Sequence, residues 1–199
     1  SVITVAYLQL TDYTRSFDES LLQGVFHVVS IGTTAGFSAS EYYLWPGFLP
    51  VLLLFVSFIG GCALSTGGGM KVIRVMLLLK QGMRELTRLI HPNAIVTVKV
   101  NKSPVSDNII NAVWGFFATY VALFAFMMLL LMASGLDQIT AFSAVAATIN
   151  NLGPGLGEVA TNYATINDFA KWVLSFAMIL GRLEIFTLLV LFIPAFWRK

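Results

Sequence analysis

Charged residues are scarce in this sequence. Asp, Glu, Lys and Arg make up 11% of its 199 residues, whereas 57% are hydrophobic, and the mean hydropathy is +0.82. Soluble domains carry about 25% charged residues. A chain with so little charge cannot cover a surface that faces water on every side, so lipid must cover part of it. The composition therefore excludes an ordinary soluble domain and predicts an integral membrane protein.

Residues that commonly build reactive centres are also few. Cys62 is the single cysteine, which excludes a disulfide within the chain and argues against a thiolate metal site. His27 and His91 are far apart in the sequence, and neither has a partner at the spacing of metal ligands. No apolar segment carries a Ser–His, paired-Asp or His–Glu set at catalytic spacing. A membrane enzyme is therefore a poorly supported alternative, and no covalent cofactor is expected.

Three apolar segments are long enough to cross a bilayer, which takes roughly 20 residues. They are residues 45–64, 112–136 and 172–196, and only the last has charges near its middle, Arg182 and Glu184. Residues 2–10 are apolar but too short to span, and no basic segment precedes them as in a signal peptide. We interpret this piece as the cut end of a helix and the sequence as a fragment of a longer protein.

The charged residues separate into basic and acidic segments. Between residues 71 and 102 there are seven basic residues and one acid, Glu85. The segments before residue 45 and between residues 136 and 172 are acidic. They contain Asp12, Asp18, Glu19, Glu41, Asp137, Glu158 and Asp168. Short loops rich in Lys and Arg stay in the cytoplasm, so the basic segment is predicted inside and the acidic segments outside. This topology explains the basic stretch, and no nucleic-acid partner is expected.

The two acidic segments share one layout: an acid, a short apolar helix, a glycine turn and a long apolar helix. The first comprises Asp18-Glu19, residues 21–31 and Gly36, and the second comprises Asp137, residues 139–149 and Gly153. The two glycines lie 117 residues apart. Acids suit helix starts, because they bond the free amides and meet the positive end of the dipole. The layout predicts an internal repeat, and repeats often place an ion site at their interface.

The two short helices are predicted to enter the membrane without crossing it. Eleven residues span only about 16 Å at 1.5 Å per residue, and both segments are too apolar for surface loops. Irregular backbone at membrane depth must be buried in protein or line water. The glycine turns that follow are therefore candidate pore linings, where carbonyls replace the hydration shell of an ion. The alternative is that each turn merely joins two helices.

The turns carry a family resemblance. Thr33-Thr34-Ala35-Gly36-Phe37-Ser38 resembles a filter strand of the Trk, Ktr and HKT potassium transporter superfamily, and Asn151-Leu152-Gly153-Pro154-Gly155 resembles the fourth filter strand of its bacterial members. Further matches are Gly60-Gly61-Cys62, Ser65 to Lys71, His91 to Ala94, Ala112 to Phe117 and Gly181 to Glu184. The resemblance covers essentially the whole chain. Leu64 departs from it, because a small residue is expected there.

The resemblance implies an all-α integral membrane protein with repeated membrane helix–pore loop–membrane helix units, as in potassium channels, and two re-entrant pore helices. Residues 1–105 would be the third of four units: a helix end, a pore helix at about 19–32, a filter at 33–38, a helix from 45 broken at about 62–70, and a cytoplasmic segment. Residues 106–199 would be the fourth: a helix at about 108–136, a pore helix at 138–149, a filter at 150–156 and a helix at about 168–197.

The resemblance also implies potassium transport across the bacterial inner membrane, with potassium as the transported ion. The filter residues would be Thr34, Ala35, Gly36, Phe37, Asn151, Leu152, Gly153 and Pro154. Two alternatives stay open. One is a non-conducting assembly or sensor subunit, which the two filter glycines oppose, and the other is a relative permeable to both sodium and potassium.

A glycine run follows the apolar segment that begins at residue 45. It comprises Ser65, Thr66, Gly67, Gly68 and Gly69. Each glycine disfavours a helix by about 1 kcal/mol relative to alanine, so the helix should break here, either as a flexible exit or, as the resemblance implies, as an intramembrane gate. Arg182 would lie at the same constriction by resemblance, and Glu184 is interpreted as a structural charge.

The resemblance supplies the expected partners. They are a second copy of the protein in a homodimer, a cytosolic nucleotide-binding regulatory ring of the TrkA type on the basic face, the N-terminal half of the same protein, and membrane lipid. The residues alone indicate only a basic cytoplasmic face.

Overall fold

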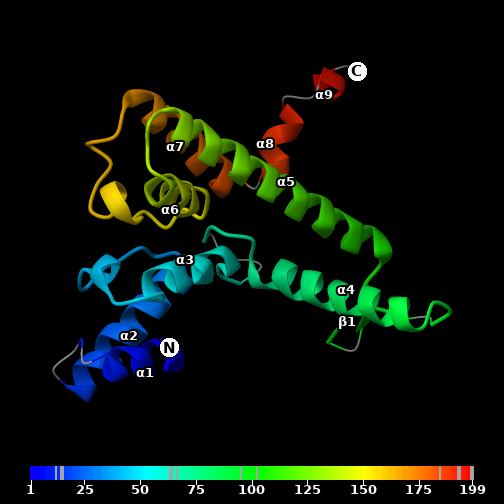
Figure 1. Cartoon of the computed structure of the whole chain (residues 1–199). Coiled ribbons are helices and arrows are strands. Elements are labelled where there is room, and N and C mark those ends of the chain that lie inside the picture. The colour runs from blue at the N-terminus through cyan, green and yellow to red at the C-terminus, as the bar shows by residue number, and fades with distance from the viewer. Residues whose placement is uncertain are drawn as a thin grey trace.

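The computed structural model describes residues 1–11, 13, 16–62, 65, 67–94, 96–101, 103–183, 185–191 and 194–197. Within these ranges the fold is helical apart from one short two-stranded ribbon (Figure 1). Thr66 and Glu184, for which roles were predicted, lie outside the described residues.

The elements follow one another in two similar series. The first contains α1 (Val2–Leu10), α2 (Phe17–Gly32), the 3-10 helix η1 (Tyr42–Leu44), α3 (Leu49–Ile59) and α4 (Val72–Ile90). The antiparallel strands β1 (Lys99–Val100) and β2 (Ser103–Pro104) follow. The second contains α5 (Asp107–Ala133), α6 (Gln138–Ile149), η2 (Gly157–Val159), α7 (Asp168–Arg182), α8 (Ile185–Leu191) and α9 (Pro194–Trp197).

The predicted pore helix of the first series is α2, which packs between α1 and α3. Ser16 caps its start by accepting the N–H of Glu19 at 3.2 Å, and the acids predicted there occupy the first turn. A buried apolar cluster on this side includes Leu8, Ile31, Leu49, Leu53 and Leu54, together with Leu152 and Leu156 from the second series. This cluster joins the two series beside the turns that follow the pore helices.

The pore helix of the second series, α6, lies inside the molecule, packed against α5 and α7 (Figure 1). Asp137 caps it by accepting the N–H groups of Ile139 at 3.0 Å and Thr140 at 3.2 Å. Nine of its twelve residues are buried, because small side chains let the neighbouring helices approach closely. At twelve residues it covers about 18 Å and is too short to cross a bilayer.

The helix expected from residue 45 to the break at about 62–70 is shorter in the structure. It begins at Leu49, after Pro46 and the left-handed Gly47, and ends at Ile59, directly before Gly60, whose φ is +66°. The glycine run folds back here, since a Cβ on Gly60 would collide with the carbonyl oxygen of Gly68. Met70 then donates its N–H to the carbonyl of Phe58 at 2.9 Å. The helix ends early because the glycine run folds back against its last turn, and helical propensity alone does not reveal such a contact.

Of the other predicted spans, one is continuous and one is divided. α5 has 27 residues and is long and apolar enough to cross a membrane. The last span, expected as one helix over about 168–197, contains α7 and α8, whose axes differ by 110°. The end of α7 is held against the pore helix, because a Cβ on Gly181 would collide with the carbonyl of Ile149.

The two ends of the molecule differ in charge as the sequence predicted. α4 and the ribbon extend from one end, and the segment from η2 to α7, yellow to orange, lies at the other (Figure 1). α4 carries the basic residues, and the η2 segment carries Glu158. Arg84 of α4 is buried and pairs with Asp107 at the start of α5, with 2.7 Å between Nη1 and Oδ1. α4 is thereby tied to the longest helix of the second series.

Candidate functional site

The turns that follow the two pore helices have the same backbone conformation. Thr34 (φ 58°) and Asn151 (φ 52°) are left-handed although neither is glycine, and Gly36 (φ 76°) and Gly153 (φ 105°) are left-handed two residues later. Left-handed backbone is uncommon outside glycine. The same two exceptions, 117 residues apart, therefore indicate one turn geometry built twice.

Hydrogen bonds to the pore helices repeat with the same spacing. Ala35 donates its N–H to the carbonyl of Ser30 at 2.8 Å, and Leu152 donates to the carbonyl of Ala147 at the same distance. In each turn the following glycine N–H lies 3.4 Å from that same carbonyl. The repeat seen as a glycine spacing in the sequence is thus also a repeat of backbone geometry.

The two turns lie side by side. A Cβ on Gly36 would collide with the carbonyl oxygen of Leu152, and it would lie 3.5 Å from Cδ of Pro154. A Cβ on Gly153, by contrast, would have no atom of the described chain within 4 Å. Gly36 is therefore required by close approach of the second turn, whereas Gly153 is required by its backbone angle and faces open space.

An outer cavity of about 560 Å³ reaches both turns. Its lining includes Gly36, Gly153, Glu41, Tyr42 and Tyr163. Glu41 is the one charged side chain among the described residues that line it, and a carboxylate at the mouth of a cleft raises the local concentration of cations. The cavity lies on the side predicted to be external.

The glycine run packs against the ends of both pore helices. Gly68 donates its N–H to Oγ1 of Thr34 at 3.1 Å, and a Cβ on Gly68 would collide with the carbonyl of Asn150. A Cβ on Gly67 would approach Oγ1 of Thr34 to 2.9 Å. Both pore helices therefore direct their C-terminal ends, which carry partial negative charge, towards the glycine run.

A buried polar chain fixes the end of α6. Tyr120 of α5 donates to Oδ1 of Asn150 at 2.6 Å, and Nδ2 of Asn150 donates to Oγ of Ser57 at 3.0 Å. Ser57 in turn donates to the carbonyl of Leu54 at 2.6 Å. Sequence reasoning missed this chain, although polar residues inside apolar spans, which seldom lack a partner, were a signal for it.

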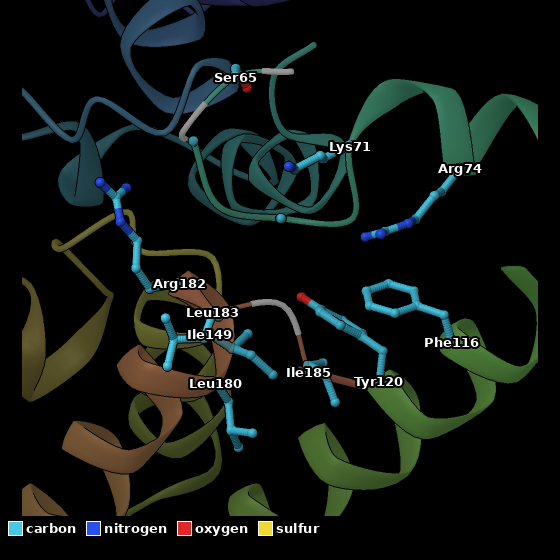
Figure 2. A pocket seen from close by; sticks show the side chains of 13 residues that line it. Ser65, Lys71, Arg74, Phe116, Tyr120, Ile149, Leu180, Arg182, Leu183 and Ile185 are labelled. Atoms are coloured by element: carbon cyan, nitrogen blue, oxygen red, sulfur yellow. The ribbon is translucent and has the colours of Figure 1, made fainter. Parts of the chain in front are cut away.

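An inner cavity of about 330 Å³ lies beneath the turns. Ser65, Gly67 and Gly69 of the glycine run line it together with Arg182, so four of the five described members of the predicted gate line one cavity. Figure 2 shows Ser65 and Arg182 among the lining residues. Gly68 lies on the side of the run that faces the turns. Thr66 and Glu184 lie outside the described residues.

Two further basic residues line the same cavity. They are Lys71 and Arg74, to which sequence analysis gave no role in the gate. Arg74 lies over the ring of Phe116, with its guanidinium carbon 4.2 Å from the ring centroid (Figure 2). Such a cation–π contact orients the guanidinium. Three basic residues thus line the cavity, whereas the sequence prediction placed only Arg182 there.

The fold and the site define a helical integral membrane protein built from repeated helix–pore loop–helix units. The profile of the TrkH family, described as cation transport protein, matches residues 8–199. The chain belongs to this family.

Several relatives are similar over nearly the whole chain. The Trk system potassium uptake protein TrkH of Halomonas elongata is 57% identical over 198 residues, which are 100% of this chain and 41% of that protein. The protein of the same name from Vibrio parahaemolyticus is 60% identical over 187 residues, 94% of this chain and 38% of that protein. The crystal structure of the potassium transporter TrkH from Vibrio parahaemolyticus has a TM-score of 0.93 at 56% identity, covering 99% of this chain and 42% of that one. The chain thus spans about two fifths of the length of these relatives.

Proposed function

We propose that this chain supplies two pore units of a potassium uptake protein of the bacterial inner membrane. The observation that carries the proposal is the pair of equivalent turns, which lie side by side between an outer and an inner cavity. The printed names of the relatives describe potassium uptake, which supports potassium as the transported ion.

The turns suit cation selection by backbone carbonyls. The proposed ligands are the carbonyl oxygens of residues 34–37 and 151–154, whose left-handed backbone at alternate positions redirects successive carbonyls. Carbonyl oxygens replace the hydration shell of a cation without adding fixed charge, so the ion can also leave. The C-terminal ends of α2 and α6 add partial negative charge on the inner side.

The glycine run and Arg182 are proposed as the gate. The run contacts both turns through Gly67 and Gly68, so a shift of the run alters the floor of the filter. Arg182 lines the inner cavity beneath it and would oppose a cation electrostatically. Glu184 is proposed only as a structural charge.

The proposed assembly extends beyond this chain. It includes the N-terminal half of the same protein to supply the other pore units, a second copy in a homodimer, and surrounding lipid. A cytosolic nucleotide-binding ring of the TrkA type is proposed on the end that carries α4, where the basic residues gather.

Ion uptake by the full-length natural protein in liposomes tests this function. Radioactive rubidium should enter vesicles loaded with potassium, and external potassium should compete far better than sodium. Empty vesicles give the background, and Gly36→Ser protein is the matched control for uptake through the filter. No uptake above background would indicate the non-conducting alternative, and equal competition by sodium would indicate the sodium-permeable one.

A further inference from the structure

Two tyrosines of the outer cavity donate hydrogen bonds to the second turn. The hydroxyl of Tyr163 donates to the carbonyl of Gly153 at 2.7 Å. The hydroxyl of Tyr42 lies 3.3 Å from the carbonyl of Pro154 and 3.2 Å from that of Gly155. Tyr42 belongs to the first pore unit and Tyr163 to the second, so both units restrain the same strand.

The first turn has a different restraint. Ser30 of its own pore helix donates from Oγ to the carbonyl of Phe37 at 2.7 Å. With the 117-residue spacing, Phe37 corresponds to Pro154 and Ser30 corresponds to Ala147, which has no hydroxyl. Tyr42 therefore supplies, from the neighbouring unit, the bond that the second pore helix cannot make.

Gly153 needs an external restraint more than its counterpart does. Gly36 lies against the carbonyl of Leu152, whereas nothing in the described chain lies within 4 Å of a Cβ at Gly153. Its left-handed backbone is thus not held by close packing on that side. The short bond from Tyr163 fixes the direction of the Gly153 carbonyl, and carbonyl direction decides how well a strand replaces the hydration shell of an ion.

The hydroxyls are suited to act as permanent donors. Tyr42 is 1% exposed and packs against the ring of His27 at 5.7 Å between centroids. Burial raises the pKa of Tyr42 to about 12, and burial together with the nearby Tyr42 also raises the pKa of Tyr163. Both groups keep their protons at physiological pH, so both continue to donate.

We infer that Tyr42 and Tyr163 are positioning residues for the fourth filter strand, holding the carbonyls of Gly153 and Pro154 so that the strand discriminates between cations. The inference rests on the proposed function and goes beyond it, because it assigns selectivity to side chains outside the filter. It also makes the geometry of one pore unit depend on a residue of the neighbouring unit.

The test compares hydroxyl deletions in the full-length protein. Tyr163→Phe and Tyr42→Phe keep the rings and remove one donor each. Tyr7→Phe is the control, since the Tyr7 ring packs on Phe48 and its hydroxyl lies beside Gly47. The potassium-to-sodium permeability ratio should fall about three- to tenfold in the first two, the range that one lost hydrogen bond gives. It should stay unchanged in Tyr7→Phe. Ala147→Ser should restore part of the ratio in Tyr42→Phe protein, because it places a hydroxyl where the first unit has Ser30.

The outcome separates positioning from packing. A merely structural role would lower the amount of folded protein and leave the ratio of the remaining channels unchanged, and that result overturns the inference. If Tyr163→Phe protein does not accumulate, the ratio of Tyr42→Phe decides. Gly153→Ser is measured in parallel: if it lowers the ratio while neither tyrosine variant does, the filter stands and the positioning role falls. If none of these three variants changes the permeability ratio, the filter assignment and the positioning role are both wrong.

Discussion

The two pore helices build the same turn in different surroundings. α6 is enclosed by its neighbours, with nine of its twelve residues buried. α2 instead exposes an apolar face that includes Leu22 at 71% and Val29 at 55%. A groove of about 520 Å³ follows this face down to Ala35 and Phe37 of the first turn. In a membrane protein such an apolar face is covered by lipid or by protein, and under the proposed function the remaining pore units would cover it.

The difference shows which features of each turn are specified by its own pore helix and which depend on contacts from other helices. The left-handed residues and the hydrogen bonds to the pore helix occur in both turns, so α2 and α6 each specify them. The buried chain of Tyr120, Asn150 and Ser57 fixes the end of α6, and the described residues show no such chain at the end of α2. Predictions that compare equivalent positions therefore separate the two contributions.

The largest effect is expected at Gly36 and Gly153, the glycines of the proposed filter. Gly36→Ser adds a Cβ that collides with the carbonyl of Leu152, and the left-handed backbone adds a cost of about 1–2 kcal/mol for a non-glycine residue. Gly153→Ser carries only the backbone cost. Both should lower the potassium-to-sodium permeability ratio, Gly153→Ser by about tenfold, because 1.4 kcal/mol is a factor of ten, and Gly36→Ser by more. Equal ratios in both variants and the natural protein would reject the filter assignment.

A second prediction concerns Asn150 and its equivalent, Thr33. Asn150→Ala leaves the buried hydroxyl of Tyr120 without its acceptor, while Ser57 loses one hydrogen bond and keeps the one to Leu54. An unsatisfied buried group costs about 1–3 kcal/mol. Thr33 is exposed, and its hydroxyl lies 2.7 Å from the carbonyl of Val29 and 3.4 Å from that of Ser30, both in its own helix. Thermal unfolding of the purified protein should show a clear loss for Asn150→Ala and a small one for Thr33→Ala. Similar losses would mean that the two helix ends are supported alike.

A third prediction concerns the gate on the inner side. With the 117-residue spacing, Arg182 corresponds to Ser65 of the glycine run, and both line the inner cavity. Arg182→Ala removes a positive charge from the proposed path, so basal potassium flux should rise several-fold and depend less on the cytosolic partner. Lys171→Ala is the matched control, because it removes a basic residue that pairs with Asp168 near the start of the same helix, and it should leave partner dependence intact. If Arg182→Ala folds normally and keeps ordinary flux and partner dependence, Arg182 has no gating role.

The smallest effect is expected at the helix caps. Asp137 caps α6 with a carboxylate whose pKa is lowered, first by its hydrogen bond with Thr140, whereas α2 is capped by the neutral Ser16. The folded-state pKa lies below the unfolded value of about 3.9, so this stabilisation is complete above that pH and is lost as the pH falls through the folded value. The unfolding temperature of Asp137→Ser protein should therefore depend less on pH below about 4, by a few degrees, than that of the natural protein. An unchanged acid dependence would contradict the role of this cap.

Sequence patterns anticipated the elements that depend on local chemistry. The expected pore helices at about 19–32 and 138–149 lie within two residues of α2 and α6, because capping groups and apolar runs act over a few residues. The end of α3 directly before Gly60 was not anticipated, since it depends on the return of Gly68 across the chain. Tyr42, Tyr163 and Asn150 were missed for the same reason: each is ordinary in sequence and becomes informative only through partners that lie 10, 30, 93, 112 and 113 residues away.

The most direct test of the central claim is to locate the ion. Crystals of the full-length protein grown with rubidium or thallium should show anomalous density between the turns, within coordination distance of carbonyl oxygens of residues 34–37 and 151–154. The Gly36→Ser protein should lose occupancy there under the same conditions. Well-ordered turns without density between them, or density confined to another part of the molecule, would contradict the claim that these paired turns select the transported ion.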